Sequence, residues 1–395
     1  MNIKKLVVNA GRPLVVYTAA VLAGTLLLFR HLGSITPGVS AAEQAQANFA
    51  SNFQRIIDNP LYAPQTMLSW LVQKIGQGTP FGLRAPSALI GLAVLCSFYI
   101  LLRQWFTLRI AALGTLLFAC SSWFLHTARI GLPNILLMSI VILVMLAVRL
   151  KHTAHPKIVL LFLLIALAAT VYIPGLVWFV AAGLFWQRKI IVHEIKAFHF
   201  SLSFLAVLFS LLLLSPLVLA FLKHPHLITA WLGLPNQVPS FGTMARNLLN
   251  IPVQLFVRGP RSPSLWLGRI PILDVFTSIM FLLGVYTYSL HLRLDQAQMI
   301  GGIFAIGVIL IALAGPVNLT VLLPWIYVVA ITGLAYFWQQ WLSVFPRNPF
   351  ARGIGNAFLI AVILLACGYH LLHYFIAWPR NTDTKQIFST TIMNR

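Results

Sequence analysis

The sequence predicts an all-α integral membrane protein, on the basis of its composition and of its recurring apolar runs. The chain has 395 residues, of which 59% are hydrophobic and 8% are charged, and its mean hydropathy is +0.89. A soluble domain carries roughly 25% charged residues. Runs of roughly 20 apolar residues recur along the chain, and each can cross a bilayer as a helix. We therefore expect one membrane domain over residues 1–395.

About eleven transmembrane helices are expected from these runs. Pro174 and Gly175 divide one long run into two short helices, and Pro216 predicts a kink whose freed backbone groups need a neighbouring helix or a cavity. The first span should stay as an anchor, because residues 1–12 are too short and too weakly patterned for a removable signal peptide. The expected spans are 13–30, 84–102, 108–125, 131–149, 157–173, 174–187, 198–222, 270–290, 297–314, 317–338 and 353–376.

The positive charges indicate how the chain is oriented. The formal net charge is +21, but the basic residues are scattered between apolar runs and form no stripe, which argues against nucleic-acid binding. They follow the positive-inside rule instead, which predicts a multi-pass plasma-membrane protein with a cytoplasmic N-terminus and extracytoplasmic long loops. The expected inner positions are Lys4, Lys5, Arg12, Arg103, Arg109, Arg149, Lys151, Lys157, Arg188, Lys189, Lys196, Arg293, Arg347 and Arg352.

Two long outer loops, residues 31–83 and 223–269, hold much of the polar sequence, and residues 377–395 form a short tail. In the first loop, apolar residues at helical spacing predict an amphipathic surface helix over about 41–57. A second, mostly apolar segment covers 67–75. The first loop should therefore contain two juxtamembrane helices.

The second outer loop is basic and contains no acidic residue. A further surface helix is expected over 244–255. Basic side chains beside a membrane suit anionic headgroups or a lipid-linked phosphate, and ordinary headgroup anchoring is the alternative for each of them. The candidates for phosphate binding in this loop are Arg246, Arg258 and Arg261.

Neither a disulfide framework nor a metal site is expected. Cys96, Cys120 and Cys367 all fall in expected spans, and the sequence has no Cys-x-x-Cys. No spacing of His, Glu or Asp predicts metal ligands. His126 is interpreted as a packed, hydrogen-bonded polar side chain rather than a ligand, and Asp274 as a residue that starts a helix.

Three segments, in this order, carry a family resemblance. They are Asn-Pro-Leu-Tyr at 59–62, Arg-Ala-Pro-Ser-Ala-Leu-Ile-Gly at 84–91 and Thr-Ala-Arg-Ile-Gly-Leu-Pro-Asn at 127–134. This order resembles the membrane glycosyltransferases of the protein-O-mannosyltransferase and aminoarabinose-transferase type, which have the GT-C fold. The resemblance extends over residues 13–190 and more weakly as far as residue 340.

The resemblance implies an inverting enzyme that uses a polyprenyl-phosphate sugar as donor on the outer face of the membrane. A carboxylate in the first outer loop would serve as base or orient the acceptor, and basic residues would hold the lipid phosphate. Glu43 and Asp58 are thus the catalytic candidates, and Arg84 and Arg129 join the candidates for phosphate binding. The implied partners are membrane lipids and the lipid-linked sugar, which is the donor substrate.

Each candidate also has a structural interpretation. Ser40 and Glu43 have the spacing of a capping box, in which the glutamate reaches back to the helix start, and this role can coexist with catalysis. Asp58 can be a turn residue paired with Arg55. The arginines at the ends of spans can extend to lipid headgroups.

The sequence is compatible with three functions. The first is transfer of a sugar to an envelope lipid, glycan or protein. The second is a non-catalytic relative that binds a polyprenyl lipid or a partner, which Ala42 and Asn134 favour because the family usually has Asp there. The third is a transporter, although the sequence has almost no intramembrane acid and no repeated half-structure.

Overall fold

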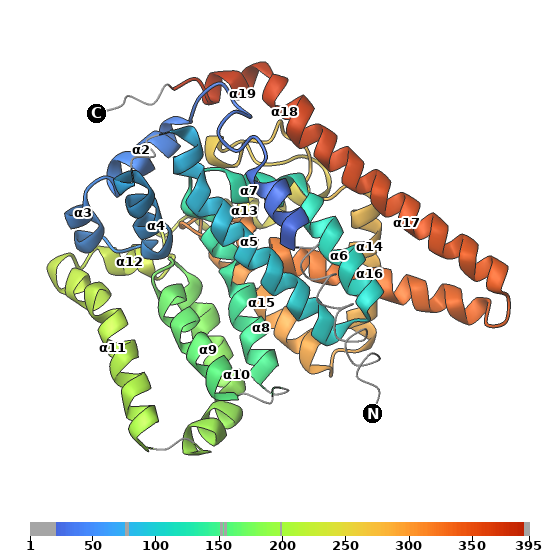
Figure 1. Cartoon of the computed structure of the whole chain (residues 1–395), viewed down its shortest axis with the longest axis horizontal. Helices are drawn as coiled ribbons and strands as arrows, with labels where there is room; N and C mark the ends of the chain where they lie inside the picture. The colour runs from blue at the N-terminus through green and yellow to red at the C-terminus, as the bar shows by residue number, and fades with distance from the viewer. Residues whose placement is uncertain (1–20, 76–78, 151–152, 154–155, 198–199, 391–395) are drawn as a thin grey trace, which may run out of the picture.

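The computed structural model confirms the all-α fold class (Figure 1). In the part of the chain that it describes, extended pairing is limited to one isolated bridge between Val39 and Thr390. The described residues are 21–75, 79–150, 153, 156–197 and 200–390.

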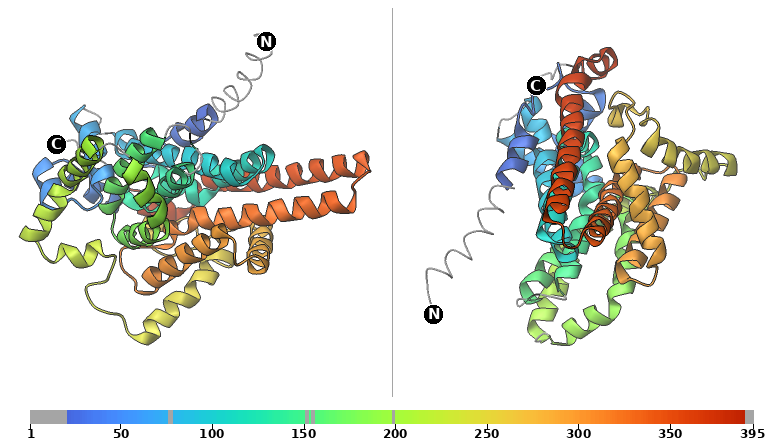
Figure 2. Two further views of the ribbon diagram at one scale, coloured as in Figure 1. Left: turned by 90° about the horizontal axis from the view of Figure 1, so that it is seen from below. Right: turned by 90° about the vertical axis from the view of Figure 1, so that its right-hand side faces the viewer.

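Long apolar helices form the body of the molecule (Figures 1 and 2). Within the described ranges, four helical segments are long and apolar enough to cross a membrane, and a bent pair makes up to five. Shorter apolar helices add to these, and the total of eleven spans stays a prediction. The helices of the body are α5 (Pro80–Trp105), α6 (Leu108–Cys120), α7 (Ser122–Arg129), α8 (Ile140–Leu150), α9 (Pro156–Val171), α10 (Leu176–Ala197), α11 (Phe200–Lys223), α14 (Val275–Leu290), α15 (Asp295–Ala312), α16 (Leu323–Val344) and α17 (Pro349–Leu372).

Four of the expected spans contain a break or a non-α turn, and in the span over 317–338 it is the 3-10 helix η3 (Leu319–Val321). The span over 108–125 is broken, because α6 and α7 meet at an angle of 61°. The span over 131–149 opens with the 3-10 helix η1 (Pro133–Ser139), and α17 continues into the π-helix η4 (His373–Ala377). These irregular segments contact one another, since α7 lies against both η1 and η4. Non-α turns inside apolar helices often mark functional positions.

The first loop folds into three short helices rather than the two expected. They are α2 (Ala41–Ala50), α3 (Phe53–Asp58) and α4 (Ala63–Lys74). The prediction of one helix over 41–57 is wrong, because the side chain of Asn52 accepts the Gln54 N–H at 2.9 Å and starts a new helix.

The remaining short helices lie in the second loop, in the tail and, in the case of η3, between α15 and α16. The expected surface helix over 244–255 is confirmed as α13. The C-terminal segment returns to the first loop, where Thr390 pairs with Val39. These elements are α12 (Leu227–Trp231), α13 (Phe241–Phe256), η2 (Pro263–Leu265), η3 (Leu319–Val321), α18 (Trp378–Arg380) and α19 (Thr382–Ile387).

The closest helix crossing in the core is between α14 and α16. A methyl group on Gly284 would lie 1.9 Å from the Val329 carbonyl oxygen, and one on Gly333 would lie 1.9 Å from the Met280 carbonyl oxygen. Small residues allow such close approach in membranes, where packing rather than hydrophobic expulsion drives helix association. These two glycines therefore fix how α14 and α16 cross.

The outer faces of the helices carry large apolar side chains. Leu212 is 68% exposed, Leu222 is 75% exposed and Leu365 is 73% exposed. Soluble monomers rarely expose contiguous apolar surface of this kind. The protein is an integral membrane protein, and these faces are the ones that contact lipid.

Candidate functional site

One face of the start of α5 joins the first loop to the helix bundle. Arg84, Ser87 and Gly91 share this face, because they follow one another at three- and four-residue spacing. Ser87 Oγ accepts a hydrogen bond from Gln65 Nε2 of α4 at 2.7 Å. A methyl group on Gly91 would lie 2.6 Å from the Ala128 Cβ of α7, so the glycine allows these two helices to touch. The segment from Arg84 to Gly91 is therefore the junction at which the first loop, α5 and α7 meet.

Glu43 and Arg84 form a buried ion pair at this junction. Arg84 Nε donates to Glu43 Oε1 at 2.8 Å, and Arg84 Nη2 donates to Oε2 at 3.2 Å. Each residue is 1% exposed. The expected capping box is confirmed, since the Ser40 N–H donates to Oε2 at 2.9 Å and Ser40 Oγ accepts the Glu43 N–H at 3.2 Å. The Gly131 N–H donates to Oε1 at 2.9 Å.

The carboxylate of Glu43 is thus fully used in this conformation. A carboxylate offers about four acceptor positions, and the Arg84, Ser40 and Gly131 donors fill them. Burial alone would raise the pKa of Glu43, but Arg84 and the two backbone N–H donors outweigh it and hold the pKa below its ordinary value of 4.5. Glu43 is therefore ionised at neutral pH and faces protein on all sides.

The guanidinium of Arg84 is also used by the protein. Nη1 donates to the Leu32 carbonyl at 3.2 Å, and Nη2 donates to Thr36 Oγ1 at 3.0 Å and to the Gly38 carbonyl at 3.1 Å. The ring of Phe388, from the C-terminal segment, lies 5.9 Å from the guanidinium carbon. Arg84 thereby ties the chain before α2 and the C-terminal segment to α5.

Arg129 makes a similar buried junction one helix away. It is 1% exposed, and its two terminal nitrogens donate to the Leu27 carbonyl at 2.9 Å and the Arg30 carbonyl at 2.5 Å. These carbonyls belong to the end of the first described helix, where basic side chains complement the helix dipole. The ring of Phe375 lies 4.7 Å from the guanidinium carbon. The structure therefore brings Glu43, Arg84 and Arg129 to one end of the bundle.

Asp58 lies apart from this buried cluster. It is half-buried at the end of α3 and accepts a hydrogen bond from Gln54 Nε2 at 3.1 Å. The expected partner Arg55 donates instead to the Asn48 carbonyl at 3.3 Å. The pairing of Asp58 with Arg55 was therefore the wrong expectation for this turn.

The arginines of the second loop differ from Arg84 and Arg129 in being open. Arg246 lies on α13, and Arg258 and Arg261 follow it; all three side chains are exposed. Their guanidiniums make no hydrogen bond or ion pair with any described residue. These three guanidiniums are therefore available to bind an anion.

A second buried polar chain escaped the sequence analysis. Ser122 Oγ lies 3.0 Å from His370 Nδ1, and His370 Nε2 lies 3.1 Å from Asp274 Oδ2. Asp274 also accepts the Thr277 N–H at 3.0 Å as the N-cap of α14, which confirms its interpretation as a helix-start residue. The available signal was a histidine inside an apolar span, because such residues need a partner. This chain links α7, α14 and α17.

Two further polar positions have structural contacts. His126 is fully buried and packs edge-on against Trp378, with ring centroids 5.2 Å apart. The expected packing is confirmed, but the expected hydrogen bond is absent, since neither ring nitrogen has a hydrogen-bond partner among the described residues. Asn134 Oδ1 accepts from Asn318 Nδ2 at 3.4 Å and so links η1 to η3. No group of three or more His, Cys, Asp or Glu side chains in the described ranges could hold a metal ion.

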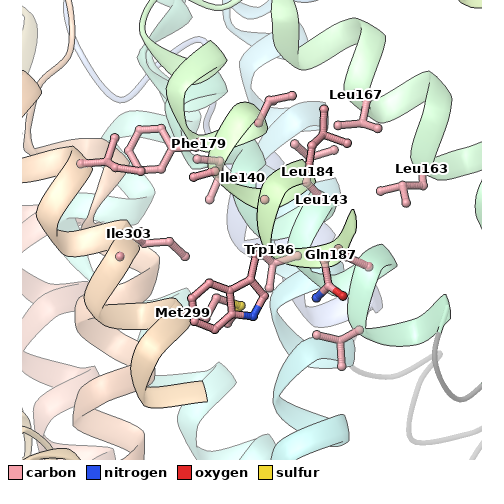
Figure 3. A pocket seen from close by; sticks show the side chains of 18 of the residues that line it. Ile140, Leu143, Leu163, Leu167, Phe179, Leu184, Trp186, Gln187, Met299 and Ile303 are labelled. Carbon is pink, nitrogen blue, oxygen red and sulfur yellow. The ribbon is translucent and has the colours of Figure 1, made fainter. Parts of the chain in front are cut away.

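An apolar cavity of about 160 Å³ lies between α8, α9, α10 and α15. Leu163 and Leu167 line it from α9, and Met299 and Ile303 face them from α15 (Figure 3). Gln187 is one of its few polar side chains. None of the predicted site residues lines this cavity. Its apolar composition suits a hydrocarbon chain.

The fold has known counterparts among solved structures, although neither a protein-family model nor a curated protein sequence matches the chain. One counterpart is ArnT from Cupriavidus metallidurans in the apo state, with a TM-score of 0.53 and 13% identity over 96% of this chain and 77% of ArnT. Another is the same enzyme bound to undecaprenyl phosphate, with a TM-score of 0.56 and 12% identity over 95% of this chain and 76% of ArnT. The chain therefore has the GT-C-type fold of this aminoarabinose transferase, as its sequence motifs predicted.

Proposed function

We propose that this protein transfers a sugar from a polyprenyl-phosphate donor to an envelope acceptor on the outer face of the plasma membrane. The observation that carries this proposal is the fold match to ArnT over 96% of the chain. A second structure of the same enzyme holds undecaprenyl phosphate, which supports a polyprenyl phosphate as the lipid part of the donor here.

The open arginines of the second loop are the proposed first contact for the donor phosphate. Arg246, Arg258 and Arg261 are exposed and carry no protein partner in the described residues. The leaving group is a phosphate, so positive charge near it stabilises the transition state. The apolar cavity between α9 and α15 has the composition that a prenyl chain needs, but none of its lining residues belongs to the second loop.

Glu43 is the proposed base, and its ion pair with Arg84 must open for it to act. The donor phosphate would replace the carboxylate on Arg84, which frees Glu43 and places both charges beside the sugar. The acceptor hydroxyl then attacks the anomeric carbon opposite the phosphate. Its proton passes to Glu43, and the carbon–oxygen bond breaks so that polyprenyl phosphate leaves with the bonding electrons. Asp58 would guide the acceptor, and Arg129 would hold the junction in place.

A second candidate function is donor binding without transfer. The four hydrogen bonds to the Glu43 carboxylate favour it, because they leave no acceptor position for a substrate hydroxyl in this conformation. The residues Ala42 and Asn134 point the same way. Such a protein would bind polyprenyl phosphates and yield no product with any donor.

The experiment uses the purified full-length protein with a panel of polyprenyl-phosphate sugars. Glu43→Gln should abolish transfer while the donor still binds. Asp295→Asn is the matched control, because Asp295 is an exposed carboxylate at the start of α15. If Glu43→Gln retained full transfer, Glu43 would have a structural role only.

Donor binding separates the two candidate functions. Arg258→Gln combined with Arg261→Gln should weaken binding at least tenfold, with Arg293→Gln, an exposed arginine in the turn before α15, as the control. Binding that depends on these arginines, without turnover across the whole panel, would identify the non-catalytic function.

A further inference from the structure

A second cavity lies at the far end of α5 from the Glu43–Arg84 ion pair. Helix α5 has 26 residues, which spans about 39 Å at 1.5 Å per residue, and α6 begins three residues after it ends. The cavity has a volume of about 370 Å³ and is open to the surface. It is lined by Arg109 from α6, Trp338 and Leu342 from α16, and Arg352, Gly353 and Asn356 from α17.

The two arginines of this cavity are without protein partners. Arg109 and Arg352 are exposed, and in the described part of the chain neither guanidinium makes a hydrogen bond or an ion pair. Among the described residues that line the cavity none is acidic, and the other polar side chains are those of Asn356 and Trp338. Two arginines from different helices that line one space present a site for an anion with several oxygens.

The surroundings of the cavity are those of a lipid-facing surface. Leu108 is 49% exposed, Val344 is 66% exposed and Phe350 is 76% exposed, and all three lie within a few residues of the lining. The hairpin of α16 and α17 extends beyond the helices next to it (Figures 1 and 2). Tryptophan at such a position is typical of the boundary between hydrocarbon and headgroups. The cavity therefore opens where a headgroup would lie.

Helices α16 and α17 pack closely beside the cavity. A methyl group on Gly355 would lie 2.2 Å from the Trp341 Nε1, so α16 and α17 are in tight contact there. Trp341 Nε1 also donates to the Ala351 carbonyl at 3.2 Å. A methyl group on Gly353, in contrast, would meet nothing within 4 Å. On the side of Gly355, α17 packs closely against α16, and on the side of Gly353 it leaves free space.

We propose that this cavity binds the phosphate of an anionic phospholipid headgroup between Arg109 and Arg352, with its acyl chains along the exposed apolar faces of α16 and α17. Basic pockets between membrane helices recognise anionic headgroups in this way. The site lies away from the first loop and is independent of the proposed sugar transfer.

The test is native mass spectrometry of the full-length protein in detergent, titrated with phosphatidylglycerol, with phosphatidylethanolamine and with inorganic phosphate. Phosphatidylglycerol should bind as a single high-affinity adduct, and phosphatidylethanolamine should bind at least fivefold more weakly. Arg109→Gln combined with Arg352→Gln should weaken phosphatidylglycerol binding at least fivefold. Gly353→Leu, which keeps both arginines and fills the free space, should do the same.

The matched control combines Arg149→Gln with Arg293→Gln, which removes two exposed arginines outside the cavity. The proposal is overturned if this control weakens binding as much as the cavity variants, because the attraction would then be general. It is also overturned if both lipids bind equally, or if millimolar inorganic phosphate competes as well as the lipid does. Unchanged binding in Gly353→Leu would place the lipid elsewhere.

Discussion

The two ends of the bundle use their arginines in opposite ways. At the end that carries the first loop, Arg84 and Arg129 are each 1% exposed and donate to protein carbonyls, a hydroxyl and one carboxylate. At the other end, Arg109 and Arg352 are exposed and have no partner in the described residues. The chain has 27 basic and six acidic side chains, so most of its arginines cannot find a carboxylate. A rare acid holds Arg84 in the core, whereas Arg129 is held there by hydrogen bonds to backbone carbonyls.

This comparison also explains how the first loop is held. Taking two charges out of water is costly, and only further hydrogen bonds make such a pair favourable. Glu43 and Arg84 receive them from Ser40, Gly131 and the chain between residues 32 and 38. The Glu43–Arg84 pair therefore holds the first loop to the bundle, whereas Arg109 and Arg352 at the opposite end hold no segment in place.

Breaking the buried pair should have the largest effect. Glu43→Ala leaves Arg84 buried without a counter-charge, and Arg84→Ala leaves Glu43 in the same state, so each should lower the free energy of unfolding by about 3–5 kcal/mol. The double variant should cost clearly less than the sum of the two. Thermal unfolding in detergent measures this cycle, with Arg109→Ala, an exposed arginine, as the control. Additive losses would show that the two side chains act independently.

Substitution of Arg129 should have the second-largest effect on stability, because Arg129 donates its hydrogen bonds to carbonyls rather than to an acid. Arg129→Lys keeps the charge but loses the second donor and the stacking on Phe375. We expect a loss of about 1.5–3 kcal/mol, the range for hydrogen bonds to a charged group. Thermal unfolding of Arg129→Lys is compared with that of Arg352→Lys. Arg352 is exposed, so its substitution should leave the free energy of unfolding nearly unchanged. An equal loss in both would remove the distinction between the two ends.

The sequence predicted one half of this arrangement and missed the other. The capping box of Ser40 and Glu43 is a local pattern of three-residue spacing and was readable. The partner of Glu43 was not, because Arg84 lies 41 residues away and reaches it only through the folded loop. The break at Asn52 was missed for a related reason, since apolar spacing continues across a residue whose side chain restarts the helix. The contact between His370 and Asp274 was missed for the same reason, because the two residues are 96 positions apart in the sequence and meet only in the folded protein.

The charge state of Glu43 should make stability fall in acid. Its pKa in the folded protein is held below the ordinary value of 4.5, so ionised Glu43 contributes stability above that pH. This contribution is lost progressively as the pH falls below 4.5 and through the folded-state pKa. Unfolding temperatures measured from pH 7 to pH 3 should drop for the wild type and stay flatter for Glu43→Gln. Parallel profiles would assign the acid sensitivity to another of the six acids.

Asp58→Asn should have the smallest effect on stability and is therefore the most informative about chemistry. Asp58 is half-buried and its recorded bond is to Gln54 on the same helix, so the free energy of unfolding should change by less than about 0.5 kcal/mol. A folded, stable Asp58→Asn protein that had lost sugar transfer would place the acceptor beside α3. Unchanged transfer would leave Glu43 as the only predicted carboxylate of the site, and the opening of its pair with Arg84 would then have to supply both the base and the phosphate contact.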